Sequence, residues 1–223
     1  MLILLPNLLE ETLSPERFLP ATLGATIKLI QGLIAESEKA GRRYLRKFLS
    51  HDEMAALPIR LLNEHTKDLT QLLEPLHDQT WGLISDAGLP CLADPGADLV
   101  WQARQQGIAI ETHAGPSSII FALQLSGFPA QRFAFHGYLS RDNPDIKGLE
   151  KRSKAENATQ VFIEAPYRSA KLLEALLTTL APTTRLCAAA SLTTPHERVI
   201  SQTVAKWPKV ELGKEPVVFL IFA

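Results

Sequence analysis

The sequence "ISDAGLPCLADPG", residues 84–96, joins two hydrophobic segments and contains the turn-favouring dipeptides Ala-Gly, Leu-Pro and Pro-Gly. Gly88 and Gly96 permit positive φ and close backbone approach, whereas Pro90 and Pro95 fix φ and stiffen the loop. The loop follows a predicted strand, and ligands of open α/β sheets bind beyond the carboxyl ends of the strands. We therefore interpret it as a loop that presents backbone N–H and C=O groups to a polar cofactor.

A structural interpretation of the same loop is equally open, because Asp94 and Pro95 would suit the N-cap and first position of the next helix. A second loop, residues 112–120, also ends a predicted strand and begins a predicted helix. Gly115 makes the turn, and Ser117 or Ser118 can cap the helix or face a ligand. No G-x-G-x-x-G or Walker A sequence occurs, so ordinary dinucleotide and nucleoside triphosphate sites are disfavoured.

Outward from these loops, strand-like and helical segments alternate, which predicts an α/β fold with βαβ units and a mostly parallel sheet. The expected strands are 2–5, 32–36, 59–63, 80–85 and 108–113, and the expected helices are 37–49, 65–77, 96–107 and 116–127. The pattern changes after residue 127. There we expect strands at 132–139, 159–164, 185–192, 196–204 and 215–223, the last two paired, and a helix at 167–180. We place two α/β domains at 1–113 and 114–223.

Composition bounds the function. The chain has 223 residues with a net charge of −1, so no global field draws it to nucleic acid or membrane, and a polyanion site must be a local patch. Two cysteines, Cys91 and Cys187, make a disulfide framework or a Cys/His metal site unexpected and favour a reducing cytoplasm. The apolar ends of the chain read as strands, not as a signal peptide or a membrane span.

Three segments together carry a family resemblance: "ISDAGLPCLADPGADLV", "GPSSIIFALQLSGFPAQRFAFHGYL" and "TQVFIEAPYR". They resemble the tetrapyrrole methylase superfamily, and within it the bacterial 16S rRNA 2′-O-ribose methyltransferase branch. The segments "IAESEKAGRRYLRKF" and "LLNEHT" resemble further parts of that branch, whereas the first forty residues match weakly.

The resemblance implies a homodimer of two-domain subunits that binds S-adenosylmethionine in a cleft between the domains. Carried over by position, the cofactor residues are Gly88, Leu89, Pro90, Cys91, Leu92, Ser117, Ser118, Ile163, Glu164, Leu192, Pro216 and Val218. Leu89 replaces a residue that is Asp or Thr in other members. Leu8 stands where the branch has a glycine, so its side chain is expected on the substrate side of the cleft, and Ser37 replaces an acidic residue.

Methylation of a ribose hydroxyl needs a proton acceptor near the transition state. Glu36 and His65, at predicted strand ends, are the candidate catalytic residues, and Glu164 and Tyr167 would face the same cleft from the second domain. Structural roles remain open for the first two: an ion pair with nearby arginines for Glu36, and helix capping for His65.

The segment "KAGRRYLRK" spaces its cations at i, i+3, i+4, i+7 and i+8, which places them on one face of a helix. Such a stripe can follow an RNA backbone, although a solvated helix face is the alternative. The candidate RNA-binding residues are Lys39, Arg42, Arg43, Arg46 and Lys47.

The sequence thus predicts a cytoplasmic S-adenosylmethionine-dependent methyltransferase of two α/β domains that acts on the ribose 2′-O of ribosomal RNA, without a metal or a membrane. Two alternatives stay open: a methylase of a tetrapyrrole or other small molecule, and a catalytically weakened protein that binds the cofactor.

Overall fold

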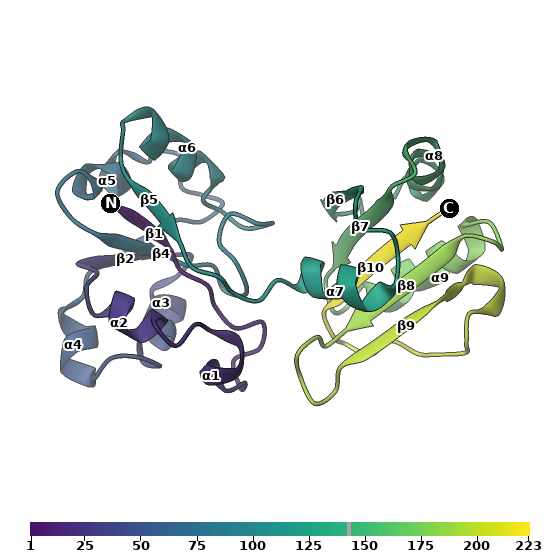
Figure 1. The fold of residues 1–223 in the computed structure, drawn as a ribbon, viewed down its shortest axis with the longest axis horizontal. Helices are drawn as coiled ribbons and strands as arrows, with labels where there is room; N and C mark the ends of the chain where they lie inside the picture. The colour runs from purple at the N-terminus through teal and green to yellow at the C-terminus, as the bar shows by residue number, and fades with distance from the viewer. Residues whose placement is uncertain (142–143) are drawn as a thin grey trace. The chain divides into compact units, whose positions relative to one another are not determined.

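The computed structural model describes residues 1–141 and 144–223. They form two compact units, Met1–Ser117 and Ser118–Ala223, each with its own five-stranded sheet (Figure 1). The division falls a few residues after the boundary expected between residues 113 and 114. None of the described helices is long and apolar enough to cross a lipid bilayer.

The first unit is built on a fully parallel sheet with strand order β3-β2-β4-β1-β5. Its strands are β1 (Leu2–Leu4), β2 (Gly32–Ala35), β3 (Ile59–Leu61), β4 (Trp81–Leu83) and β5 (Ile110–Thr112). Its helices are α1 (Pro15–Phe18), α2 (Leu23–Ile27), α3 (Glu38–Leu45), α4 (His51–Ala56), α5 (Thr70–Leu73), the 3₁₀ helix η1 (Glu74–Leu76) and α6 (Ala97–Gln105). The α/β class is confirmed.

Helices cover both faces of this sheet. Every residue of β2 and β4 is buried, which requires cover on both sides. One core gathers residues of α2, α3 and α4 against one face, and the other gathers residues of α5, η1 and α6 against the opposite face. The alternation of side chains along a strand separates the two cores, since Leu33 belongs to the first and Ile34 to the second. The strands are thereby held with their carboxyl ends at one edge.

The second unit has a mixed sheet with strand order β6-β7-β10-β8-β9, in which only β6 and β7 are parallel. Its strands are β6 (Phe133–Tyr138), β7 (Thr159–Glu164), β8 (Arg185–Ala190), β9 (Arg198–Thr203) and β10 (Val217–Phe222). Its helices are α7 (Ser118–Ser126), α8 (Ile146–Glu156), α9 (Ser169–Thr179) and the 3₁₀ helix η2 (Val204–Lys206).

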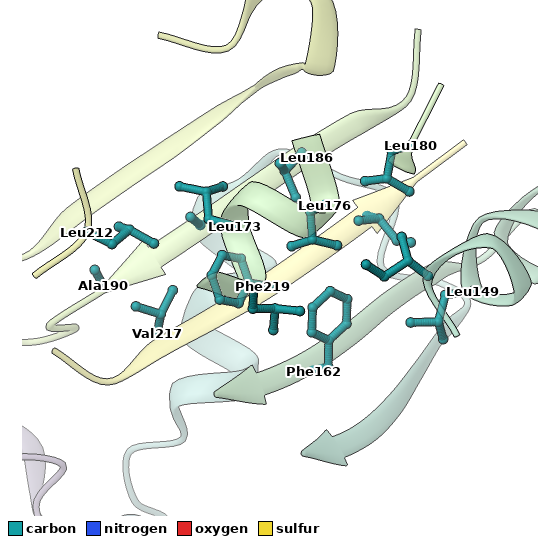
Figure 2. Close-up of a cluster of buried hydrophobic side chains, with 14 residues drawn as sticks. Leu149, Phe162, Leu173, Leu176, Leu180, Leu186, Ala190, Leu212, Val217 and Phe219 are labelled. Atoms are coloured by element: carbon teal, nitrogen blue, oxygen red, sulfur yellow. The ribbon is translucent and has the colours of Figure 1, made fainter. Parts of the chain in front are cut away.

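The core of this unit lies between the sheet and helices α8 and α9 (Figure 2). Phe162 and Phe219, on the neighbouring strands β7 and β10, stack with ring centroids 5.8 Å apart. Leu173 and Leu176 of α9 close the core from above, and α7 packs on the opposite face against β8, β9 and β10. The core therefore depends on β10 as a central strand.

The structure corrects three expectations. The strands at 196–204 and 215–223 do not pair with each other, because β8 lies between β9 and β10. The helix expected over 37–49 ends at Leu45, and that over 65–77 is reduced to α5 and η1. Helices α1, α2, α4 and α8 were not expected, since their sequences are short or polar.

Candidate functional site

The carboxyl ends of the first unit's strands carry loops that form a hollow of about 460 Å³. One wall comes from the loop after β4 and the other from the segment after β5. The hollow is lined by Leu4, Leu89, Pro90, Cys91, Leu92, Thr112, His113, Ala114 and Gly115. Four of the expected cofactor residues, Leu89 to Leu92, are thus brought together with the second glycine-bearing loop.

The loop after β4 is held in left-handed backbone conformations. Cys91 and Ala93 have φ of 67° and 71°, which is uncommon for residues with a Cβ atom, and Gly88 and Gly96 have φ of 71° and 132°. Non-glycine residues in this region store strain and concentrate at ligand sites. Burial, with a smaller contribution from the Asp94 carboxylate, raises the pKa of the Cys91 thiol to about 11, so the thiol stays protonated and serves as a lining group.

Gly88 connects the loop after β4 to the segment after β1 through its backbone. Its carbonyl accepts from the amide of Asn7 at 2.7 Å, and its amide donates to the carbonyl of Leu8 at 3.3 Å. Asn7, which sequence reasoning missed, also donates from Nδ2 to the carbonyls of Ser85 and Asp86 at 3.1 and 2.9 Å. Asn7 and Gly88 therefore anchor the loop from beneath.

Gly115 occupies the tightest position of the second loop. A Cβ atom there would lie 2.1 Å from Cβ of Pro6 and 3.2 Å from Cδ2 of Leu89. The segment after β5 therefore packs against Pro6 only because residue 115 has no side chain.

Three carboxylates follow β2 and β4 in the chain, and the charge of one of them, Asp94, acts on Cys91 of the hollow. The Asp86 amide donates to Glu36 Oε1 at 3.1 Å, and the Ser85 hydroxyl donates to the Ala87 carbonyl at 3.0 Å. Burial raises the pKa of Glu36. The hydrogen bond from the Asp86 amide partly offsets this rise, and the negative charge of Asp86 adds to it. Burial, followed by the Glu36 charge, raises the pKa of Asp94 to about 6. Asp94 is not the N-cap of α6, because that position is taken by Gly96.

Replacing Asp94 with asparagine should stabilise the protein at pH 7.5 and not at pH 3.5. The folded protein holds a proton on Asp94 up to about pH 6, whereas an unfolded chain releases it near the ordinary pKa of 3.8. The free-energy cost of burying the ionised carboxylate therefore increases as the pH rises from 3.8 to about 6, and it stays constant at higher pH. Allowing for solvent screening, we expect about 1 kcal/mol, or about 2–4 °C in Tm, by thermal unfolding at both pH values.

Asp98→Asn, in the exposed first turn of α6, is the matched control and should show no such pH dependence. An equal change in Tm at both pH values for Asp94→Asn would show that the stabilisation does not come from removing a buried charge.

Three other expected positions have structural environments. Leu8 is 3% exposed and packs in the first unit's core, so the expectation that its side chain lies on the substrate side is wrong. Ser37 is the N-cap of α3, since its Oγ accepts from the Ala40 amide at 3.1 Å. His65 is exposed, and its amide donates to Asn63 Oδ1, whose side chain reaches the Glu36 carbonyl at 3.4 Å.

The basic stripe is not a uniform helix face. Arg42 donates to the carbonyls of Met54 and Leu57, which end α4, so it ties two helices together. Arg43 pairs with Glu11 at 2.8 Å. Lys47 lies beyond the end of α3, 5.6 Å from the Tyr44 ring centroid, and burial lowers its pKa. Only Lys39 and Arg46 of the five are exposed.

The second unit collects its expected residues at one end of its sheet. Ile163 and Val218 face each other across β7 and β10 in register, and the Ser191 amide donates to the Pro216 carbonyl at 3.3 Å. Leu192 is buried in the loop after β8, between Ser191 and Thr193 with φ of 49° and 72°.

Glu164, at the end of β7, is buried and accepts from Arg168 Nη2 at 2.7 Å and from the Ala165 amide. Its carboxylate is therefore fully engaged within this unit. Ser117, at the end of the first unit, is buried, and Ser118 begins α7.

A family model described as Tetrapyrrole (Corrin/Porphyrin) Methylases matches residues 28–208, which include the loops of the hollow. The chain belongs to this family. Membership of this family supports the expected enzyme class, an S-adenosylmethionine-dependent methyltransferase, and the expected cofactor.

Curated relatives of this methylase are named Ribosomal RNA small subunit methyltransferase I. That of Thermotoga maritima is 30% identical over 152 residues, covering 68% of this chain and 67% of the relative. That of Xylella fastidiosa is 33% identical over 169 residues, covering 73% and 60%. Across such relatives the match spans about half to two thirds of their length, from 47% to 67% in the first three. The resemblance to the rRNA methyltransferase branch is thereby confirmed.

Solved structures show the same fold at low identity. The crystal structure of diphthine synthase superposes with a TM-score of 0.69 at 14% identity, covering 100% of this chain and 89% of that chain. The methyltransferase CobJ gives 0.61 at 15% identity, covering 94% and 90%.

The residues of this tetrapyrrole methylase fit the cofactor. A hollow of about 460 Å³ lies within the roughly 300–1,000 Å³ range of ligand pockets. It mixes apolar side chains with the strained backbone of the loop at Cys91.

Proposed function

We propose that the chain is a ribosomal RNA 2′-O-ribose methyltransferase. The observation that carries the proposal is the hollow between the loops after β4 and β5, with a carboxylate of raised pKa at the neighbouring strand end. Cys91 lines the hollow. The Asp94 charge contributes to the raised pKa of Cys91, and the Glu36 charge contributes to the raised pKa of Asp94, so the three side chains interact electrostatically. The names of the curated relatives support ribosomal RNA as the acceptor.

The residues of the hollow have a positioning role. S-adenosylmethionine, when bound, supplies an electrophilic methyl group. Transfer is an in-line displacement, so the main task of the protein is alignment, and a stiff, pre-strained loop loses little conformational entropy on binding. We assign Leu89, Pro90, Cys91 and Leu92 to one wall of the cofactor site and Gly115 to the other.

Glu36 is the proposed proton acceptor for the ribose hydroxyl. Its raised pKa brings a carboxylate closer to the operating pH, which suits general base catalysis. Glu164 is a poorer candidate, because Arg168 neutralises it and its oxygens are occupied. His65 is exposed and stays a second candidate beside the same strand ends.

The exposed cations Lys39 and Arg46 are the proposed RNA phosphate contacts of the stripe. We expect Lys39→Glu combined with Arg46→Glu to weaken RNA binding and to flatten its salt dependence, by roughly 0.7 log units per log unit of salt for each lost contact. Fluorescence anisotropy at several salt concentrations measures both quantities. The free energy of unfolding should change little, because both side chains are exposed.

Lys151→Glu combined with Lys154→Glu, which reverses two exposed cations of α8, is the charge-matched control. Arg42 is unsuitable for this test, because its loss would free the carbonyls that end α4 and cost about 1–3 kcal/mol. An unchanged salt slope in the double variant would assign the stripe to a solvated face.

We also propose that the protein works as a homodimer, as the family resemblance implies. Sedimentation at micromolar concentration would refute this by showing a species of 24.6 kDa.

The proposed function is tested by transfer of labelled methyl from S-adenosylmethionine to small ribosomal subunits, free rRNA and tetrapyrroles. We expect label in RNA, at a nucleotide whose 3′ linkage becomes resistant to alkali, because 2′-O-methylation removes the hydroxyl that attacks it. Label in tetrapyrroles would support a small-molecule methylase. Cofactor binding without transfer would support a catalytically weakened protein.

A further inference from the structure

Two large aromatic side chains are exposed at the carboxyl end of the parallel pair β6–β7 in the second unit. Tyr138, the last residue of β6, is 59% exposed, and Tyr167, in the turn between β7 and α9, is 68% exposed. Neither ring belongs to the hydrophobic core of this unit. Burying rings of this size is strongly favourable, so two exposed tyrosines at one strand end indicate a surface that meets another molecule.

Hydrogen bonds place the two tyrosines near each other. Tyr138 pairs in register with Ile163, four residues before Tyr167 in the chain. Arg168 Nη2, next to Tyr167, donates to the carbonyl of Leu139, next to Tyr138, at 3.4 Å. The same guanidinium is held by the buried Glu164 carboxylate at 2.7 Å, so the turn is fixed against the end of β6.

The backbone of β6 is distorted just before Tyr138. The strand register shifts between Phe135 and Tyr138, and Gly137 has φ of 62° in a position where an added Cβ atom would meet nothing within 4 Å beyond its chain neighbours. Bulges of this kind re-aim the following side chain and are enriched next to functional sites. The strand is thus irregular immediately before Tyr138, and close packing at residue 137 does not account for it.

A basic residue follows each tyrosine within four residues of the sequence. Arg141 follows Tyr138 by three residues, and Lys171 follows Tyr167 by four, one turn into α9. Both are exposed, and within residues 1–141 and 144–223 no carboxylate forms an ion pair with either. Aromatic faces beside such cations are the combination by which proteins bind single-stranded nucleic acid: bases stack on the rings, and phosphates meet the charges.

We propose that Tyr138 and Tyr167 form a stacking platform for unpaired RNA bases, with Arg141 and Lys171 contacting the adjoining phosphates. The inference rests on the proposed function and specifies its substrate: an RNA segment whose bases are unpaired where it meets the second unit. Single-stranded segments are the usual targets of specific RNA recognition, because their bases can be splayed onto aromatic side chains.

The platform is tested with a short fluorescein-labelled oligouridylate and an abasic backbone of the same length. Tyr138→Ala and Tyr167→Ala should each weaken oligouridylate binding about fivefold to a hundredfold by anisotropy, and should leave binding of the abasic backbone unchanged. Tyr138→Phe and Tyr167→Phe should retain binding, because the ring and not the hydroxyl is required. Trp101→Ala, which removes a 65% exposed ring from α6 of the first unit, is the matched control and should bind as the wild type does.

The outcomes separate this inference from the proposed function. Alanine variants that bind oligouridylate like the wild type, or a wild type that does not bind it, would overturn the platform, whatever the methyl-transfer assay shows. A ring-dependent preference for oligouridylate, in a protein that transfers no methyl group to rRNA, would support the platform and refute the proposed function. Circular dichroism of each variant shows whether a loss reflects unfolding, and the phenylalanine variants keep the comparison valid if an alanine variant unfolds.

Discussion

Gly115→Ala should weaken the binding of S-adenosylhomocysteine at least tenfold, by isothermal titration calorimetry. The added methyl group would meet Cβ of Pro6 at 2.1 Å, and a proline ring cannot rotate away. Relief requires the segment after β5 to shift relative to Pro6, and because Gly115 lines the hollow, one of its walls shifts with that segment. Overpacking of this kind costs about 1–3 kcal/mol, so part of the effect should appear as a lower Tm.

Gly24→Ala is the matched control for this substitution. Its Cβ atom would lie 3.7 Å from the Phe48 ring, an ordinary contact, within helix α2. Alanine is favoured over glycine in helices, so this variant should be as stable as the wild type or more stable, with unchanged ligand affinity. Tight binding by Gly115→Ala would show that the two loops do not enclose the cofactor.

Glu36→Gln should lower the rate of methyl transfer to RNA by about a hundredfold or more, the scale of general base catalysis. Glutamine keeps an oxygen that can accept from the Asp86 amide, so the loop should be preserved and cofactor affinity unchanged. Because the folded-state pKa of Glu36 is raised, the wild-type rate should fall tenfold per pH unit below that pKa and level off above it. The variant should lose this dependence.

Glu38→Gln, two residues further along, is the control, since that carboxylate is exposed and lies 3.5 Å from Arg42. Single-turnover rates of the wild type and both variants, measured across the pH range, test this role of Glu36. A Glu36→Gln rate within threefold of the wild type would exclude Glu36 as the base and direct attention to His65.

The parallel sheet of the first unit was predictable because its strands are short apolar runs separated by helical spacing. The order of strands in the second unit was not. The run "VVFLIF" of β10 is apolar on both faces, as a central strand requires, whereas "RVISQT" of β9 is half-buried along most of its length, as an edge strand is. This contrast was present in the sequence, but chain order suggested that the two would pair.

The loop at Cys91 was found from its glycines and prolines, which act locally. Long-range partners were not available to such reasoning. Asn7 donates to the loop from 78 residues earlier in the chain. Arg42 donates to a carbonyl at the end of α4, and the spacing of the cations in α3 gives no sign of this partner. A helical wheel placed five cations on one face, yet the helix ends before Lys47.

The central position of β10 also bears on synthesis. The first unit is complete once Ser117 has been made, so it can fold while the rest of the chain is still on the ribosome. In the second unit, β7 and β8 have no strand between them until residues 217–222 emerge. Until then their inner edges are unpaired and Phe162 lacks its stacking partner Phe219. The nascent second unit therefore exposes two unpaired strand edges until its last strand is made, and such edges can pair with other chains.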